Sequence, residues 1–171
     1  MTGLRTQKRR RRECKTDYKG RLSLLKSGVD RIVIRQTNKY FIVQLVTSEE
    51  SKDKVLLSAT SKDLIKEGLN EKFTGSLKSV TAGYLTGILF ANKADKKGKY
   101  IIDLGMTRNF YGNRNYSVVK GLIDGGLKIN ANEKIFPSED RLAGKHLKPE
   151  VKKEFDKVLS KIGGNKKWVK K

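Results

Sequence analysis

Five consecutive cationic residues near the start of the chain, Lys8 to Arg12, place the strongest constraint on what it can fold into. Their mutual repulsion destabilises any compact structure that is built from them alone. The flanking sequence does not relieve this repulsion, because residues 1–27 hold ten Lys/Arg and only two acids. Residues 145–171 hold ten Lys and three acids. We therefore expect two basic ends that lie outside the core and face a partner of opposite charge.

The charge of the whole chain indicates the class of that partner. The chain has 39 Lys+Arg against 18 Asp+Glu, a formal net charge of +21 over 171 residues. This exceeds what solubility requires and indicates an acidic polymer or an anionic surface. Because there are two basic ends, we favour nucleic acid over a nuclear localisation signal or a solubilising tail. Arginine suits phosphate oxygens, and we expect Arg9–Arg12 to be disordered when free and to order on binding.

Several other classes of function find little support. A single Cys allows no intrachain disulfide and fits a reducing, intracellular setting. One Cys and one His cannot form a zinc-finger site, and no phosphate-binding glycine loop is visible. The longest mostly apolar run, residues 82–91, is about half of what spans a bilayer. The sequence therefore predicts no metal, no cofactor and no membrane partner.

A catalytic role is an alternative that rests on carboxylates. Asp103 lies in an apolar, strand-like run and, with Asp124, Glu139 and Asp140, forms a possible metal-binding set for phosphodiester cleavage. The last three lack a defined spacing, and a buried Asp beside a Gly-rich turn more often accepts local backbone hydrogen bonds. We therefore expect no enzyme. The alternatives are an RNA-processing or RNA-chaperone factor and, less favoured, a metal-dependent nuclease.

Apolar patterning predicts an α/β fold. Three strand-like runs, residues 31–36, 40–47 and 54–60, are separated by short polar stretches, which predicts an antiparallel meander. A fourth run at residues 100–105 follows an amphipathic helical stretch at residues 76–93. The expected fold class is therefore a mixed β-sheet, in which the meander gains a strand joined by a helical crossover. Helices pack on this sheet, and basic extensions stand at both ends.

Further helices are predicted at residues 16–27, 61–68, 115–127 and 149–162. Asp17 and Gly28 are the expected start and end of the first. Pro149 in the first turn and Gly163 after the last bound the final helix.

Two pairs of glycines, each spaced four residues apart, form small-residue strips on two of these helices. They are Gly83 and Gly87, and Gly121 and Gly125. We expect another backbone to approach closely at the first strip.

One loop combines residue types that suit RNA. The stretch TRNFYGNRNYS, residues 107–117, interleaves three aromatic rings with two arginines and with asparagines. Structured RNA is recognised through phosphates, 2′-hydroxyls and stacking on unpaired bases. The alternative is that one or two of these rings cover the core, and both interpretations can hold. In the basic C-terminus, Trp168 is expected to pack against a partner or the domain surface.

Seven stretches occur in the order found in one known family: KRRRRECKTDYKGRLSLLKSG, DRIVIRQTNKYFIVQLV, LLSATSKDL, AGYLTGILFANKA, YIIDLG, VKGLIDGGLKI and DRLAGKHL. Together they resemble the large-subunit ribosomal protein eighteen family, which binds 5S ribosomal RNA and has a eukaryotic counterpart numbered five. The likeness covers the chain from about Arg5 to His146. The CKTDY stretch resembles the archaeal and eukaryotic branch, and the length resembles archaeal members.

The resemblance implies a mixed α/β sandwich with a structural, non-catalytic role on the cytoplasmic ribosome. It implies attachment of 5S RNA to large-subunit RNA in the central protuberance, beside neighbouring ribosomal proteins. The expected organisation is a basic RNA-binding arm at residues 1–15, a 5S RNA-binding domain at 16–145, and a C-terminal helix and basic tail at 146–171.

The resemblance places RNA contacts in the arm, in KTDYKGR, in the loop around residues 108–114, and in RLAGKH. The choice of side chains within these segments follows from their chemistry. The expected RNA-binding residues are Arg5, Lys8, Arg9, Arg10, Arg11, Arg12, Lys15, Tyr18, Lys19, Arg21, Arg108, Asn109, Phe110, Tyr111, Arg114, Arg141, Lys145 and His146.

Overall fold

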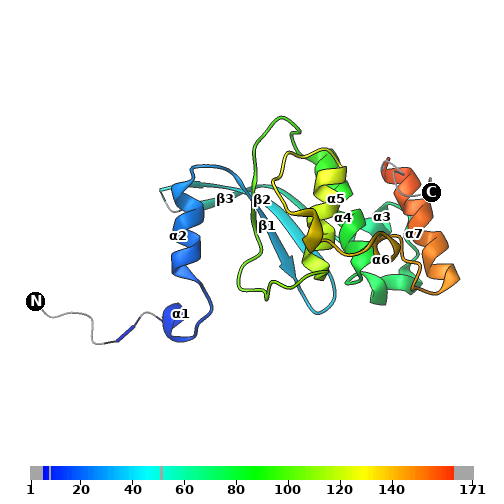
Figure 1. Ribbon diagram of the computed structural model, residues 1–171, viewed down its shortest axis with the longest axis horizontal. Coiled ribbons are helices and arrows are strands. Elements are labelled where there is room, and N and C mark those ends of the chain that lie inside the picture. The colour runs from blue at the N-terminus through cyan, green and yellow to red at the C-terminus, as the bar shows by residue number, and fades with distance from the viewer. Residues whose placement is uncertain (1–5, 8, 51, 164–171) are drawn as a thin grey trace, which may run out of the picture.

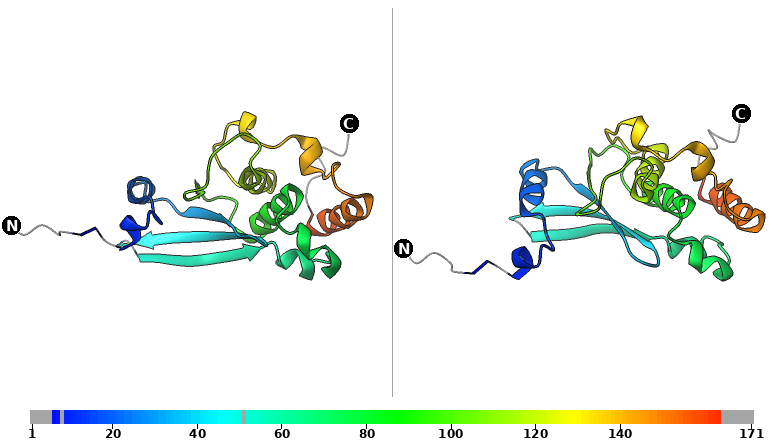
Figure 2. Two further views of the ribbon diagram at one scale, coloured as in Figure 1. Left: turned by 90° about the horizontal axis from the view of Figure 1, so that it is seen from below. Right: turned by 60° about the horizontal axis from the view of Figure 1, so that its bottom comes forward.

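A four-stranded sheet with helices on one side forms the body of the molecule (Figures 1 and 2). The computed structural model describes residues 6–7, 9–50 and 52–163. The expected contacts at Arg5 and Lys8 and the expected packing of Trp168 lie outside these residues. None of the described helices is long and apolar enough to cross a membrane.

The sheet is mixed, as the sequence predicts. Its strands are β1 (Arg31–Gln36), β2 (Phe41–Glu49), β3 (Lys52–Thr60) and β4 (Ile101–Asp103), in the order β3-β2-β1-β4. The first three form the antiparallel meander, and β4 pairs with β1 in parallel. The expected polar connection at residues 48–53 is wrong, because Ser48 pairs with Asp53 and Glu49 with Lys52 in the β2–β3 ladder. Pairing between β2 and β3 here extends both strands through polar residues whose composition is typical of a loop.

The helices are α1 (Arg9–Arg12), α2 (Tyr18–Lys26), α3 (Asp63–Lys66), α4 (Val80–Lys93), α5 (Arg114–Asp124), α6 (Glu139–Leu142) and α7 (Pro149–Ile162), with 3-10 turns η1 (Glu71–Ser76) and η2 (Glu133–Ile135). The bounds of α7 agree with the prediction, and α2 lies within its predicted range. Helix α4 begins later than expected, because the Ser79 hydroxyl accepts a hydrogen bond from the Ala82 N–H at 3.2 Å and caps it.

The two glycine strips lie against each other. Helices α4 and α5 run side by side in the same direction, with Gly87 next to Gly121. A Cβ on Gly87 would clash with the Val118 carbonyl, and one on Gly121 with the Tyr84 carbonyl. The prediction that a backbone approaches this strip is confirmed, and the approaching backbone belongs to the second strip.

The core has two parts that meet at α4. One cluster joins the sheet to α4 and α5, with Ile32, Phe41 and Phe90 among its fully buried side chains. The other joins α4 to α3, α6 and α7. Side chains on the outer strand β3 remain exposed, including Val55 and Leu56. The helices α1 and α2 stand at the end of the molecule opposite α7 (Figure 1).

Candidate RNA-binding surface

The basic arm leads into helix α2 through a set of local contacts. The four arginines Arg9–Arg12 form the single-turn helix α1, none of them buried. Arg10 donates two hydrogen bonds to the Thr16 hydroxyl, from Nε at 3.0 Å and from Nη2 at 2.9 Å. Asp17 caps α2, because its Oδ1 accepts hydrogen bonds from the backbone N–H groups of Lys19 and Gly20, both at 3.0 Å. The capping prediction is confirmed, and the order–disorder change of the arm on binding stays a prediction.

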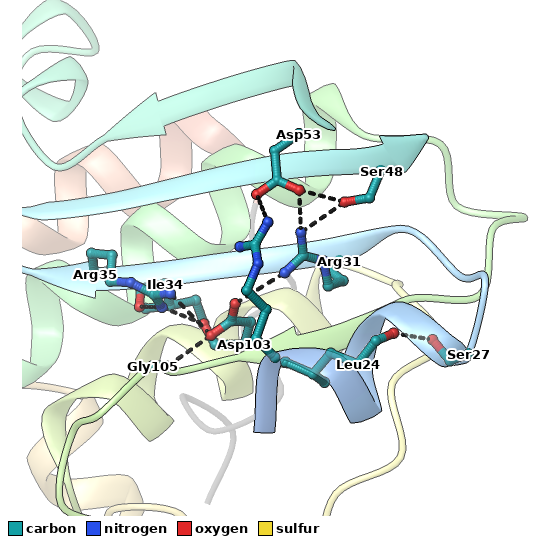
Figure 3. Close-up of polar contacts among 10 residues, drawn as sticks. Leu24, Ser27, Arg31, Ile34, Arg35, Ser48, Asp53, Asp103 and Gly105 are labelled. Carbon is teal, nitrogen blue, oxygen red and sulfur yellow. Dashed lines mark hydrogen bonds and ion pairs between the residues drawn. The ribbon is translucent and has the colours of Figure 1, made fainter. Parts of the chain in front are cut away.

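Helix α2 contains no fully buried residue and is tied to the sheet by charge. Arg21 Nη2 lies 2.8 Å from Asp53 Oδ2 on β3. The other oxygen of Asp53 accepts a 2.8 Å hydrogen bond from Arg31 Nη2, whose side chain is only 2% exposed (Figure 3). Arg31 also donates to the Ser48 hydroxyl at 2.8 Å. Arg21, expected to contact RNA, therefore also positions the helix that carries Tyr18 and Lys19.

Asp53 is held in its ionised form by this network. Burial tends to raise the pKa of the Asp53 carboxyl. Hydrogen bonds from Ser48 and Arg21, together with the charges of Arg21 and Arg31, outweigh burial, so the pKa of Asp53 lies below its ordinary value of 3.8. The Asp53 carboxyl is therefore ionised at neutral pH.

Asp103 uses both carboxylate oxygens within the fold, as Figure 3 shows. Oδ1 accepts from the Gly105 N–H at 2.8 Å and from Arg35 Nη2 at 3.0 Å, and Oδ2 lies 3.4 Å from Arg31 Nη1. These contacts match the interpretation of Asp103 as a local hydrogen-bond acceptor beside a glycine turn. Asp124, on α5, instead pairs with Lys120 at 3.2 Å. In the part of the chain that the structure describes, no group of three His, Cys, Asp or Glu residues is arranged to hold a metal.

A cleft of about 560 Å³ separates α1 and α2 from the segment that follows β4. Its cationic side chains are Arg10, Lys15, Arg21 and Arg35. Its apolar side chains are Leu24, Ile102, Leu104 and Met106, and Asn109 lines the loop side. The fold thus brings expected residues of the arm next to an expected residue of the loop. Arg35 was not predicted from the sequence, and the cation signal within its strand could not have separated it from Arg31, which is buried.

The loop between β4 and α5 presents its first two rings to solvent. Phe110 is 60% exposed and Tyr111 is 77% exposed, whereas Tyr116 is partly buried against the sheet core. The Asn113 amide donates a 2.9 Å hydrogen bond to the Arg108 carbonyl, which holds the loop closed on itself. The interpretation that a ring covers the core is therefore confirmed for Tyr116, and stacking of RNA bases on Phe110 and Tyr111 stays a prediction.

The remaining expected residues form a separate group around α6. Arg141, Lys145 and His146 are exposed, and none of them lines the cleft. Lys145 pairs with Asp140 at 2.5 Å, and the Arg141 carbonyl accepts a 3.4 Å hydrogen bond from the Thr81 hydroxyl of α4. Helix α6 stands near α7, away from α1 and α2, in both figures (Figures 1 and 2). These three residues therefore form a group apart from the cleft.

Comparison with known proteins gives consistent matches. A family model described as ribosomal large subunit proteins 60S L5 and 50S L18 matches residues 3–100. The large ribosomal subunit protein uL18 of Methanoregula boonei is 48% identical over 141 residues, covering 81% of this chain and 79% of that protein. The uL18 of Methanococcoides burtonii is 40% identical over 164 residues, covering 90% and 91%. That of Korarchaeum cryptofilum is 43% identical over 141 residues, covering 81% and 70%.

Proposed function

Because the chain belongs to the family of large-subunit ribosomal proteins 60S L5 and 50S L18, we propose that it binds 5S ribosomal RNA and attaches it to the large-subunit RNA in the central protuberance. The protein is a structural, non-enzymatic component of the large ribosomal subunit, and its named relatives are archaeal. The nuclease hypothesis is therefore abandoned. We further propose that it acts on the cytoplasmic ribosome, in contact with other ribosomal proteins.

The observation that carries the proposal is the cleft, where the basic arm and the loop after β4 face each other. Its walls supply guanidinium and ammonium groups for phosphates, together with hydroxyls of Thr16 and Ser23 that can hydrogen-bond to ribose or phosphate oxygens. Rings with open faces, Phe110 and Tyr111, stand on the same loop as Asn109. This combination of charge, hydrogen bonding and stacking suits folded RNA better than a uniform anionic surface.

Three of the four cations that line the cleft are already ion-paired within the fold, Lys15 with Glu13, Arg21 with Asp53 and Arg35 with Asp103, so the unpaired cations of this surface are Arg10 and residues around the cleft. Among the described residues, no carboxylate lies within ion-pair distance of Arg10, Arg11, Arg12, Lys19, Arg108 or Arg114. Each phosphate that such a cation neutralises releases counterions, so affinity must fall as salt rises. Separated basic groups, one at the cleft and one around α6, give the protein the means to contact two RNA segments at once.

The test is the salt dependence of RNA binding after removal of residues 1–12. If the removed arm neutralises about five phosphates, the slope of log affinity against log salt for 5S transcript drops by roughly 4. A variant with serine at positions 9 to 12 keeps the chain length and should show most of the same change. An unchanged slope in both would contradict a role for the arm. Equal affinity of the intact protein for 5S transcript and for transfer RNA would contradict the 5S assignment.

A further inference from the structure

A second hollow, of about 460 Å³, lies where the β1–β2 turn meets α3 and the start of α4. Its side chains come from Asn38, Lys39 and Tyr40 of the turn, from Lys62 and Ile65 around α3, and from Leu77 and Lys78 before α4. It shares no residue with the cleft between α2 and the loop after β4. It also contains none of the residues that the sequence assigned to RNA binding.

The rim of this hollow is positively charged and uncompensated. Lys39, Lys62 and Lys78 are all exposed, and none of them forms an ion pair with a carboxylate of the described chain. Asp63 lies next to Lys62 in sequence, but it is engaged elsewhere. It accepts hydrogen bonds from the N–H and hydroxyl of Thr60 at 2.8 and 3.1 Å, and it lies 3.5 Å from Lys66. The hollow therefore offers three ammonium groups to an external anion.

The floor of the hollow is apolar. Leu77 is 4% exposed, and Tyr40 and Ile65 are partly buried against the cluster that joins α4 to α7. Concave sites with an apolar lining and a few convergent polar groups are typical of ligand pockets. The lining suits an aliphatic or aromatic side chain, which would remove the exposed part of Ile65 from water.

We propose that this hollow binds an acidic segment of a partner protein, with one apolar side chain on the floor and flanking carboxylates on Lys39, Lys62 and Lys78. Electrostatic complementarity of this kind fixes register and speeds encounter, while the apolar contact sets the position of the segment.

Two features favour a protein partner over RNA. The rim has lysines only, which act as point charges and lack the bidentate fork that makes arginine suited to phosphate. The one aromatic ring is already covered, since Lys62 Nζ lies 4.5 Å from the centroid of the Tyr40 ring. A nucleobase therefore cannot stack on that face without displacing the ammonium group. The cleft differs on the first point, because three of its four cations are arginines.

The experiment uses the full-length protein and the fluorescein-labelled peptide Asp-Asp-Glu-Leu-Phe-Glu-Asp-Asp, with binding followed by fluorescence anisotropy. The hollow variant carries K39S, K62S and K78S. The matched control carries K96S, K97S and K99S, three exposed lysines of the α4–β4 connection, so that both lose the same charge. We expect the hollow variant to bind the peptide about tenfold more weakly than the control variant does. Equal weakening in both variants would show that peptide binding depends only on the net charge of the protein, and it would overturn the proposal.

Two further measurements, one with a second peptide and one with 5S transcript, separate the remaining outcomes. Replacing Leu-Phe by Ser-Ser in the peptide keeps its charge and removes the side chains meant for the floor. Affinity for the intact protein should then fall, and equal affinity would contradict the pocket. Loss of binding to 5S transcript in the hollow variant, with peptide binding unchanged, would make the hollow an RNA surface and end the proposal. All six lysines are exposed, and thermal denaturation followed by circular dichroism checks that both variants fold.

Discussion

Arg21 of helix α2 and Asp53 of strand β3 form a 2.8 Å ion pair between segments 32 residues apart in sequence. The same carboxylate pairs, through its other oxygen, with the buried guanidinium of Arg31 at 2.8 Å. Because α2 has no fully buried residue, this carboxylate is an attachment between the basic end of the protein and its core. The surface proposed to meet RNA and the sheet that supports it are therefore coupled through the Asp53 side chain.

Replacing Asp53 with Asn should destabilise the fold. Arg31 would lose the nearer of its two ionised partners and keep only the 3.4 Å contact with Asp103 while staying buried, and a hydrogen bond to a charged group contributes about 1.5–3 kcal/mol. We expect a loss of about 1–3 kcal/mol in the free energy of unfolding, measured by urea denaturation. Asp140→Asn is the control, because its pair with Lys145 is exposed on both sides and should change stability by less than about 1 kcal/mol. Equal effects of the two substitutions would contradict a structural role for the Asp53 network.

The same carboxylate should make stability depend on pH in the acid range. The pKa of Asp53 is lower in the folded protein than its ordinary value of 3.8, since hydrogen bonds and cations outweigh burial. A folded-state pKa below the unfolded one gives stability that is present above the unfolded pKa and is lost as pH falls through the folded pKa. The free-energy difference between wild type and Asp53→Asn should therefore shrink as pH drops below about 4. A difference that stays constant into that range would show that Asp53 ionisation is not what stabilises the network.

Elements with strong local signals could be predicted from the sequence. Pro149 and Gly163 bound α7, and Asp17 caps α2, because these residues act on the backbone within one turn. The β2–β3 hairpin could not be delimited in this way, because the polar residues Ser48 and Asp53 look like a loop until their ladder partners and Arg31 are known. Long-range pairing there overrides local composition.

The segments that form the candidate surface could be predicted from the sequence, but their arrangement in space could not. The arm and the loop at residues 107–117 stood out through charge and aromatic content. Their apposition depends on the parallel pairing of β4 with β1, which places the loop after β4 opposite α2. Arg35 enters the cleft for the same reason. The second hollow gave no sequence signal, because Lys39, Lys62 and Lys78 are dispersed and only the fold assembles them.

Gly87 should not tolerate a methyl group. A Cβ at this position would clash with the Val118 carbonyl and the Gly121 Cα, so α4 and α5 would have to separate. We expect Gly87→Ala to lower the free energy of unfolding by about 1–3 kcal/mol, despite the better helix propensity of Ala. Gly83→Ala is the comparison on the same helix face, because a Cβ there would meet side chains, the Ser117 hydroxyl, Phe41 and Val118, and no backbone atom. Urea denaturation of both variants should show a smaller loss for Gly83→Ala than for Gly87→Ala, and the reverse order would contradict the close backbone approach.

The exposed rings of the β4–α5 loop should contribute to RNA binding without contributing to stability. Phe110 and Tyr111 have most of their surface in solvent, so a double substitution to Ser removes little buried area and should leave the melting temperature nearly unchanged. Stacking of a base on an aromatic ring is worth about 1–3 kcal/mol, so affinity for 5S transcript should fall at least about fivefold if one ring stacks. Leu56→Ser on β3 is the control, since Leu56 is 51% exposed and lies outside the cleft and its loop. Because stacking carries no net charge, the salt dependence of binding should stay the same in the double variant, whereas it should flatten when the arm is removed. If the double variant bound with unchanged affinity, stacking on these rings would be contradicted, and binding at this loop would have to come from phosphate contacts.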